Sequence, residues 1–436
     1  MNFLVLPSAL ISGSVTVPGD KSISHRALML GSVAVGKTSI SGFLAGEDCL
    51  ATMRALRQMG VNIEQTGETI LHVDGVGLQG LQGPQDSLDL GNSGTAMRLF
   101  AGLLSGQSFG TILIGDQSLS SRPMQRVIEP LSAMGAKIGS VDGKPPLKLG
   151  GGAPLTAISY KLPVASAQVK SAILLAGLYA SGETFITEPA TTRDHTERML
   201  RSMGVNLVSD NGRIRMPGQQ GLVAKDIEVP GDLSSAAFLI VAALIGPDCD
   251  LLIQNVGVNP TRSGIIQILR QMGASIELEN TRMFGDEPVA DLRIRSSRLN
   301  GIEVDPALVS LAIDEFPVLF IAAAAARGVT RFSGIEELRV KESDRIDAMA
   351  QGLRTLGITV DETRDEAEVH GGHLSAGTIE SQGDHRIAMS FAIAATIAQG
   401  AIHIKDVAAV DTSFPGFTAC IGGLGVNITQ TSAATP

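Results

Sequence analysis

Arginines recur at one position of a repeated pattern, and their chemistry is the binding of anions. Six times, a helix-like stretch ends in Met-Gly or Leu-Gly and leads into a short β-prone stretch, at Gly60, Gly135, Gly204, Gly273, Gly357 and Gly425. In four of these units an arginine lies 11 to 13 residues before the glycine, namely Arg122, Arg193, Arg262 and Arg345. A cation near a helix N-terminus opposes the helix dipole, so these arginines do not stabilise their own helices. Together with the exposed N–H groups of a helix start, an arginine forms an anion site. Arg262, taken alone, is expected to be a solvated or interface arginine.

A second set of polar residues lies at six expected helix starts. Helices of small residues are expected to stop at Gly36, Gly106, Gly182, Gly246, Gly328 and Gly400. The residues 14 to 16 positions earlier are Lys21, Gly91, Ser166, Asp232, Asp314 and His385, with Ser22, Asn92, Gln168 and Arg386 at or beside them. Helix capping is the structural alternative for Ser, Asn and Asp, including Asp314. It explains Lys21, His385 and Arg386 poorly, because cations are disfavoured at helix starts. The set therefore indicates a binding or catalytic site.

The elements that carry these residues predict an α/β protein. Each unit alternates short strands with two helices, because apolar residues at helical spacing are followed by β-branched runs. The sequence VPGD occurs at 17–20 and again at 229–232, each time before a helix of small, apolar residues. Three units precede the second copy and three follow it. We therefore expect a duplicated protein of two lobes with a cleft between them.

Composition excludes several other classes of protein. With 436 residues, 44% of them hydrophobic and 18% charged, the chain is neither disordered nor confined to a single core. The apolar runs 236–246 and 316–326 are shorter than the roughly 18 residues that a membrane span needs. A net charge of −10 argues against nucleic acid as a partner. The three cysteines show no metal-binding or disulfide spacing, and the apolar start of the chain resembles a strand rather than a signal peptide, so we expect a cytoplasmic protein.

Two short motifs are set aside. Residues 31–38, GSVAVGKT, match the phosphate-binding loop of many ATPases. Such a loop follows a strand and opens a helix, whereas here a helix over 22–32 is expected to precede it and a strand to follow. His370 and His373 have the spacing of metal ligands, but they flank two glycines in an acidic turn, which predicts a solvated loop.

Eight motifs together carry a family resemblance. They are PGDKSISHR (18–26), GNSGTAMR (91–98), SRPM (121–124), ASAQVKS (165–171), TRDHTE (192–197), IDEFP (313–317), RVKESDR (339–345) and DHRIAMS (384–390). In this order they resemble the 3-phosphoshikimate 1-carboxyvinyltransferase, or EPSP synthase, family across essentially the whole chain. The resemblance implies two similar lobes, each an inside-out α/β barrel of three βαβαββ repeats. It assigns 18–229 to one lobe and 1–17 plus 230–436 to the other.

The resemblance also implies a reaction. The family transfers the enolpyruvyl group of phosphoenolpyruvate to shikimate 3-phosphate by addition and elimination, releasing phosphate, on the shikimate route to chorismate and the aromatic amino acids. It needs neither metal nor cofactor, and it is the target of glyphosate. Both substrates are small anions, which agrees with the arginines. We expect a cytoplasmic monomer that binds neither nucleic acid nor a membrane.

Residue roles carry over position by position. By resemblance, phosphoenolpyruvate binds to Lys21, Gly94, Arg122, Gln168, Arg345 and Arg386. Shikimate 3-phosphate binds to Lys21, Ser22, Arg26, Ser166, Ala167, Gln168, Arg193, Asp314 and Lys341. The attacking hydroxyl must lose a proton and the methylene carbon must gain one. Asp314 is expected to be the base, while Lys21, Glu342 and His385 remain alternatives for the proton donor.

Departures from the family pattern and the alternative functions are judged on the same residues. Thr412 stands where many members carry a lysine, which puts one phosphoenolpyruvate contact in doubt, and Leu99 replaces a common proline. Gly94 is the small residue associated with sensitivity to glyphosate.

The sister enolpyruvyl transferase acting on UDP-N-acetylglucosamine typically has a cysteine in the loop that corresponds to 115–123, where this chain has none. A non-catalytic repeat scaffold would show the same periodicity without a reason for cations at helix starts.

Overall fold

The computed structural model describes residues 1–8 and 11–432, and they form two compact units. One unit comprises Gly19–Val229 together with Met283–Glu287, and is called the 19–229 unit below. The other comprises Met1–Pro18, Pro230–Arg282 and Pro288–Pro436, and is called the 230–436 unit. The amino-terminal segment lies in the 230–436 unit because its two strands pair there with strands from the second half of the chain.

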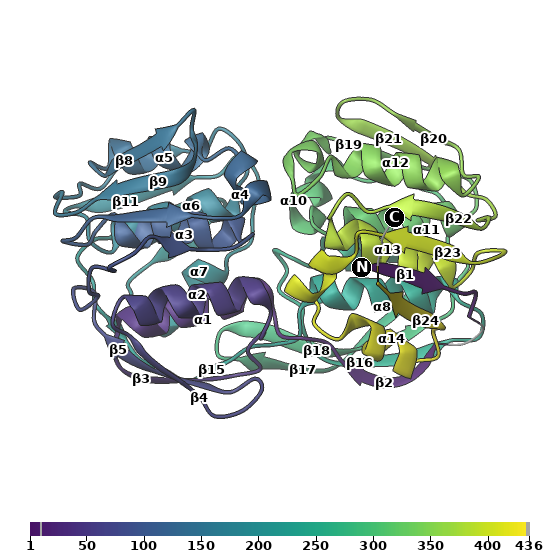
Figure 1. The fold of residues 1–436 in the computed structure, drawn as a ribbon, viewed down its shortest axis with the longest axis horizontal. Helices are drawn as coiled ribbons and strands as arrows, with labels where there is room; N and C mark the ends of the chain where they lie inside the picture. The colour runs from purple at the N-terminus through teal and green to yellow at the C-terminus, as the bar shows by residue number, and fades with distance from the viewer. Residues whose placement is uncertain (9–10, 433–436) are drawn as a thin grey trace. The chain divides into compact units, whose positions relative to one another are not determined.

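The 19–229 unit alternates helices and short strands (Figure 1). Its elements are α1 (Lys21–Val33), β3 (Ala34–Ser41), α2 (Glu47–Gln58), β4 (Asn62–Gln65), β5 (Leu71–Val76), β6 (Leu88–Asp89), α3 (Gly94–Leu104), β7 (Thr111–Ile114), α4 (Gln117–Ser121), α5 (Gln125–Ala133), β8 (Lys137–Val141), β9 (Lys144–Gly150), β10 (Ser159–Lys161), α6 (Ala167–Gly177), β11 (Glu183–Thr187), α7 (His195–Ser202), β12 (Val208–Asp210), β13 (Arg213–Pro217), β14 (Leu222–Val223) and β15 (Ile227–Glu228).

The 230–436 unit repeats this alternation and adds short 3₁₀ turns. Its elements are β1 (Asn2–Val5), β2 (Ser12–Thr16), α8 (Leu233–Ile245), β16 (Asp250–Gly257), α9 (Gly264–Gln271), β17 (Ser275–Phe284), β18 (Glu287–Arg295), η1 (Pro306–Leu308), α10 (Val309–Ala312), α11 (Phe316–Ala325), β19 (Val329–Ser333), η2 (Glu336–Val340), α12 (Arg345–Thr355), β20 (Val360–Glu362), β21 (Glu366–His370), β22 (Gly377–Glu380), α13 (His385–Ala395), β23 (Ile402–Lys405), η3 (Ala408–Thr412), α14 (Phe417–Gly423) and β24 (Ile428–Thr431).

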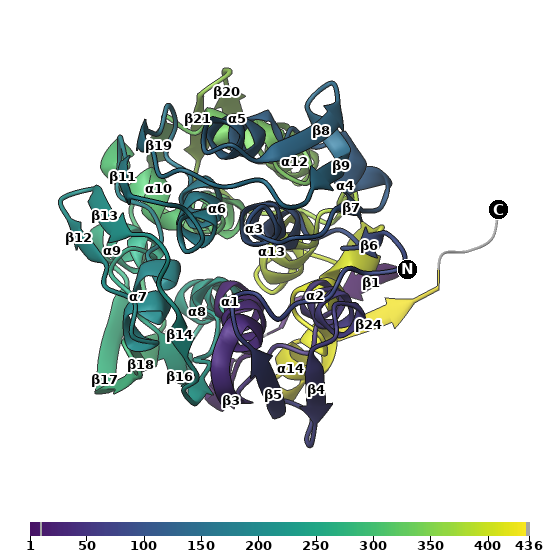
Figure 2. The ribbon, with the colours of Figure 1, turned by 90° about the vertical axis from the view of Figure 1, so that its left-hand side faces the viewer.

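Six small sheets share one topology, as a six-fold repeat requires. In the described part of the chain, each unit holds three sheets. A typical sheet has the order β10-β11-β13-β12, with one parallel pair followed by two antiparallel pairs. The strands β3, β5 and β4 lie side by side in this way in the sheet at the bottom of Figure 2. In the sheet β19-β21-β20, the parallel first strand is reduced to two isolated bridges.

Helices of small apolar residues form the core of each unit. In the 19–229 unit α3 packs against α6 and α1, and in the 230–436 unit α8, α11 and α13 pack against one another. Helix α8 is buried along almost its whole length, which is why it is apolar on every side. No helix in the described residues is long and apolar enough to cross a membrane. The fold therefore places the polar residues at the starts of these central helices in the candidate site described below.

The two series of glycines behave differently. All six glycines of the first series adopt a positive φ after a helix, so the predicted C-caps are confirmed. The second series was expected to stop helices, but only Gly36, Gly182 and Gly328 have a positive φ, and the helices end one to five residues earlier. At Gly106 a Cβ would lie 2.2 Å from the Tyr179 ring, so this glycine is required by packing rather than by backbone conformation.

Several helix starts also need adjustment. Helix α3 begins at Gly94 behind the N-cap Ser93, not at Gly91. Asp314 lies in a turn before α11, whose N-cap is Glu315, so the capping alternative for Asp314 is wrong. The apparent phosphate-binding loop is the end of α1 followed by β3, which confirms that GSVAVGKT is a chance match.

Candidate active site

Three central helices of the 19–229 unit begin with the predicted site residues. Lys21 is the first residue of α1, Gly94 that of α3 and Ala167 that of α6. Each helix has its own cap, because Asp20, Ser93 and Ser166 accept a hydrogen bond from a backbone N–H of the first turn. Ser166 is therefore engaged as an N-cap, whereas Lys21 and Gly94 have no capping role. Capping therefore does not account for their presence at helix starts.

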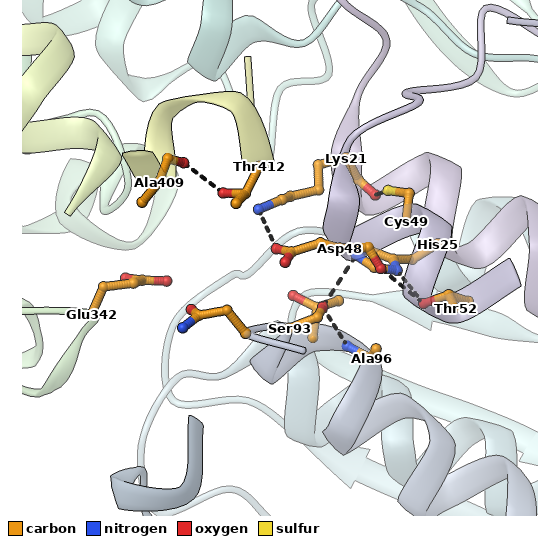
Figure 3. Close-up of polar contacts among 12 residues, drawn as sticks. Lys21, His25, Asp48, Cys49, Thr52, Ser93, Ala96, Glu342, Ala409 and Thr412 are labelled. Carbon is orange, nitrogen blue, oxygen red and sulfur yellow. Dashed lines mark hydrogen bonds and ion pairs between the residues drawn. The ribbon is translucent and has the colours of Figure 1, made fainter. Parts of the chain in front are cut away.

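Lys21 forms an ion pair with Asp48, whose Oδ2 lies 2.6 Å from Nζ (Figure 3). Asp48 lies in the first turn of α2, where its carboxylate is favoured by the helix dipole. The Lys21 side chain is 22% exposed, so the cation is held at the surface of its unit and not sealed in the core. A lysine held in this way can bind an anion without first being ordered.

Arg26 is buried one turn further along α1. Its guanidinium donates to the hydroxyls of Thr196 (2.7 Å) and Ser171 (2.8 Å) and to the Ser22 carbonyl (2.9 Å). Burial and the nearby Arg193 together lower the pKa of Arg26 to about 10, so the guanidinium remains charged at neutral pH. A pocket beside it is lined by Ser22, Arg26, Thr95, Ala167, Gln168, Arg193 and His195. The structure thus brings five of the predicted site residues to one pocket.

A network of side chains surrounds the start of α3. Gln168 accepts from Arg98 through Oε1 (2.8 Å) and donates to Thr95 (2.9 Å). Arg122 follows α4 and donates to Asn92 (2.5 Å) and to Ser118 (3.2 Å). A Cβ added at Gly94 would lie 3.2 Å from Nη1 of Arg122 and 2.8 Å from Nη1 of Arg98. Gly94 therefore leaves room beside two guanidinium groups.

Arg345 is the centre of the cluster in the 230–436 unit. It is the first residue of α12 and is fully buried, with Nε 2.8 Å from Asp384 Oδ2 and Nη2 2.6 Å from Glu342 Oε2. The carboxylates of Asp384, Glu342 and Asp314 raise the pKa of Arg345 against the opposing effect of burial. Arg345 in turn keeps the pKa of the buried Asp384 below its ordinary value, although burial alone would raise it. Arg345 and Asp384 therefore each stabilise the charged form of the other.

Asp314 lies against the same cluster from the turn before α11. Its Oδ1 is 3.6 Å from Nη1 of Arg345 and 3.9 Å from Nζ of Lys341, and its backbone carbonyl accepts from Arg386 Nη1 at 2.8 Å. Burial lowers the pKa of Lys341, while Asp314 acts in the opposite direction. The predicted residues Asp314, Lys341, Glu342, Arg345 and Arg386 thus lie together in one unit. A carboxylate in this position can act as a base toward a substrate anion that binds to these cations.

Two further predicted positions in this unit have local roles. His385 is the first residue of α13 and is buried, next to the N-cap Asp384. Thr412 donates its hydroxyl to the Ala409 carbonyl at 2.7 Å, which closes its own 3₁₀ turn (Figure 3). The Thr412 hydroxyl is therefore used within its own turn.

The expectation for Arg262 is wrong. Arg262 is buried, and its Nη2 contacts Asp232 at 2.7 Å and Ser234 at 2.6 Å. Ser234 in turn donates a hydrogen bond to Glu315, the residue after Asp314. Its partners come from helices far away in the sequence, which is why its position in the repeat did not reveal them. Arg262 braces the turn that holds Asp314.

Sequence reasoning missed several residues of these networks. Asp48, Arg98 and Asp384 each contact a predicted substrate residue, but Asp48 lies in none of the eight motifs. Asp384 and Arg98 do fall inside quoted motifs and could have been included on that basis. His370 and His373 lie in or beside strand β21 rather than in a cluster, and no group of three or more potential ligands occurs among the described residues.

His25 connects α1 and α2 with the N-cap of α3 and makes stability depend on pH. It is fully buried, with Nδ1 2.8 Å from the Thr52 hydroxyl and Nε2 3.3 Å from that of Ser93 (Figure 3). Burial lowers its pKa from 6.5 to about 3. Between these values the unfolded chain binds a proton that the folded chain does not, so the free energy of unfolding falls as pH is lowered through this window. The free energy of unfolding falls by at most about 1.4 kcal/mol for each pH unit below 6.5.

We therefore predict that His25→Asn flattens the acid limb of the stability curve. Between pH 7 and 5 the parent protein should lose about 2 kcal/mol more stability than the variant, because Asn takes up no proton. Urea unfolding at a series of pH values measures both curves. Parallel curves would show that His25 titrates normally in the folded chain.

The chain is similar to known proteins over nearly its whole length. The model of the EPSP synthase (3-phosphoshikimate 1-carboxyvinyltransferase) family matches residues 5–421. The chain is 56% identical to the 3-phosphoshikimate 1-carboxyvinyltransferase of Alkalilimnicola ehrlichii, covering 99% of this chain and 98% of that protein. It is also 56% identical to that of Methylococcus capsulatus, covering 98% of each. A solved EPSP synthase from Acinetobacter baumannii has a TM-score of 0.89 at 49% identity, over 98% of this chain and all of that one. The predicted fold class is confirmed.

Proposed function

The chain belongs to the EPSP synthase family, and from that premise we propose how its residues carry out the family's reaction. The enzyme transfers the enolpyruvyl group of phosphoenolpyruvate to shikimate 3-phosphate, giving 5-enolpyruvylshikimate 3-phosphate and phosphate. The observation that supports our assignment best is the position of Asp314 within 4 Å of the cations of Lys341 and Arg345. A carboxylate there can take a proton where an anionic substrate binds.

Substrate binding is assigned to the two clusters of cations. Phosphoenolpyruvate binds to Lys21, Gly94, Arg122, Gln168, Arg345 and Arg386. Shikimate 3-phosphate binds to Lys21, Ser22, Arg26, Ser166, Ala167, Gln168, Arg193, Asp314 and Lys341. Arginine suits this task because its planar fork matches carboxylate and phosphate oxygens. The pocket beside Arg26 and Arg193 supports the assignment for the second substrate.

The chemical step needs a base, an acid and charge stabilisation. Asp314 accepts the proton of the attacking hydroxyl of shikimate 3-phosphate. At the same time, the oxygen of this hydroxyl bonds to the second carbon of phosphoenolpyruvate. The methylene carbon receives a proton from Lys21, Glu342 or His385. In the tetrahedral intermediate, the group that protonated the methylene carbon then takes a proton back from the resulting methyl group as the C–O bond to phosphate breaks, which restores the double bond and releases phosphate. The fixed guanidinium groups stabilise the charge that gathers on the leaving phosphate.

The two-lobe organisation and the cellular setting belong to the same proposal. We take the 19–229 and 230–436 units as the two lobes that the family resemblance places at 18–229 and at 1–17 plus 230–436. The enzyme is proposed to work as a cytoplasmic monomer on small anionic substrates. Light scattering on the purified protein would give the mass of one chain if it is monomeric, and a multiple of it otherwise.

The sister reaction on UDP-N-acetylglucosamine is not favoured, because the matched family and the named relatives are EPSP synthases. Product analysis separates the two. Mass spectrometry after incubation with phosphoenolpyruvate and each acceptor should show enolpyruvyl addition to shikimate 3-phosphate alone. Addition to the nucleotide sugar would refute the proposed acceptor.

Glyphosate sensitivity is a prediction from the space at Gly94. We expect the enzyme to be inhibited, and Gly94→Ala to raise the inhibition constant about 5- to 150-fold, because overpacking a site by one methyl group costs about 1–3 kcal/mol. The added Cβ would crowd Arg98 and Arg122, whose ends lie 2.8 and 3.2 Å away. Inhibition assays at several phosphoenolpyruvate concentrations measure this. Gly91→Ala is the control, because a Cβ at Gly91 would have no atom within 4 Å. Gly91 has a positive φ, so thermal unfolding must show that the alanine variant is folded. An unchanged inhibition constant in Gly94→Ala would contradict the steric argument.

A further inference from the structure

A buried lysine lies on α6, the helix whose first two residues line the pocket of the 19–229 unit. Lys170 is the fourth residue of α6 and only 1% of its surface is exposed. Its Nζ lies 2.7 Å from Oε1 of Glu197 and 3.0 Å from Oε2 of Glu188. Both carboxylates are buried as well. Lys170 is absent from the residues assigned to either substrate, so its place needs another explanation.

The lysine also fixes the backbone of the segment that carries Arg193. Residues 188–194 form no helix or strand, so the repeat itself does not place this arginine. Lys170 Nζ donates to the carbonyl of Thr192 at 3.3 Å. The Thr192 hydroxyl donates to Glu188, whose backbone N–H donates to the Gly212 carbonyl at 2.8 Å. The residue before Arg193 is therefore held at both its carbonyl and its side chain.

Charge balance gives the two carboxylates a role as well. With all three groups ionised, Lys170, Glu188 and Glu197 carry a formal net charge of −1, and Glu197 lies close enough to Arg26 to act on its charge. Burial raises the pKa of Glu188, and Lys170 lowers it. Glu197 favours the charged form of Arg26, whereas Arg193 disfavours it. The cluster thus offsets the repulsion between two arginines that line one pocket.

Stability alone does not account for this cluster. Removing three charged groups from water is expensive, and well-packed apolar residues often stabilise a core as well as a buried ion pair does. The benefit of a buried polar cluster is a defined geometry. In this chain, the geometry that it defines is the segment carrying Arg193.

We propose that Lys170 is a positioning residue that sets Arg193 for binding shikimate 3-phosphate. The inference rests on the proposed role of Arg193. Because Lys170 acts through another residue and does not touch the substrate, its loss should weaken substrate binding without altering the chemical step. In kinetic terms, KM for shikimate 3-phosphate should rise while kcat and KM for phosphoenolpyruvate change little.

A double-mutant cycle tests this directly. Lys170→Gln is expected to raise KM for shikimate 3-phosphate at least about tenfold and to leave KM for phosphoenolpyruvate within about twofold. In an Arg193→Ala background the same change should add less than about twofold, because the group that it positions is gone. Independent effects that multiply in the double variant, or an unchanged KM in Lys170→Gln, would overturn the inference.

Two further variants separate positioning from lost stability. Leu200→Ala opens a cavity on the neighbouring helix α7, where Leu200 is fully buried, and should destabilise the fold without raising this KM. An equal rise of KM in Leu200→Ala would overturn the inference. If Lys170→Gln does not fold, Thr192→Val is the alternative variant, because it removes only the hydroxyl hydrogen bond to Glu188. It should raise KM for shikimate 3-phosphate by a smaller factor than Lys170→Gln. In the Arg193→Ala background, Thr192→Val should leave this KM unchanged. An unchanged KM in Thr192→Val would then overturn it.

Failure of the proposed function gives a different pattern. An Arg193→Ala variant with the KM of the parent enzyme would refute the role of Arg193, and the inference with it, while turnover of shikimate 3-phosphate would still establish the transfer reaction.

Discussion

Replacing Asp314 with alanine is expected to lower kcat by about 10²- to 10⁴-fold, the usual contribution of a positioned general base. Its carboxylate lies 3.6 Å from Arg345 and 3.9 Å from Lys341, beside the cations to which the anionic substrates are assigned. The backbone carbonyl of Asp314 holds Arg386, and this contact survives the substitution. Steady-state kinetics with both substrates saturating measures the loss.

Asp314→Asn is the matched control for this prediction. Its amide keeps the size of the carboxylate but cannot act as a base, so it should lose as much activity as the alanine variant. Thermal unfolding should show that both variants fold, because Asp314 is not the cap of α11. An asparagine variant that retains more than about a tenth of kcat would show that another group removes the proton.

Arg345→Lys is expected to raise KM for phosphoenolpyruvate about 10- to 100-fold. The guanidinium contacts Asp384 through Nε and Glu342 through Nη2, and it faces Asp314 through Nη1, so a single fork joins three carboxylates. A lysine keeps one charge and loses the fork. Each hydrogen bond to a charged group contributes about 1.5–3 kcal/mol, which corresponds to this range. Initial rates over a range of phosphoenolpyruvate concentrations give KM.

Arg354→Lys is the matched control on the same helix. Arg354 lies in the last turn of α12, and its side chain is 44% exposed. The same substitution there should leave KM unchanged, so a loss confined to Arg345→Lys reports the site rather than the helix. Equal kinetics in both variants would contradict the assignment of Arg345 to substrate binding.

Much of the architecture could be predicted from the repeated glycines, because a helix followed by glycine with positive φ is a local property of the chain. Gly60 and Gly135 illustrate this, since each ends a helix as predicted. Gly246 and Gly106 lie at corresponding points of the second series but lack a positive φ. Added Cβ atoms there would lie 2.8 Å from the sulfur of Cys249 and 2.2 Å from the ring of Tyr179, respectively. Close packing and backbone conformation select the same residue, so sequence alone cannot separate them.

The candidate site shows the same division. The positions of the four arginines at or just before helix starts were predicted correctly, because the glycine that ends each of these helices is visible in the sequence. What each arginine contacts was not predictable. Arg262 and Arg345 occupy equivalent positions and are both buried, yet Arg262 binds Asp232 and Arg345 binds Asp384. Partners 30 or more residues away are brought into contact by the fold, as the separations in these two pairs show.

The most direct test of the central claim is phosphate release on mixing the protein with phosphoenolpyruvate and shikimate 3-phosphate, with each substrate omitted in turn. We predict release only when both are present, and its loss in Asp314→Ala while that variant remains folded. Release from phosphoenolpyruvate alone, or release that requires UDP-N-acetylglucosamine instead of shikimate 3-phosphate, would contradict the account.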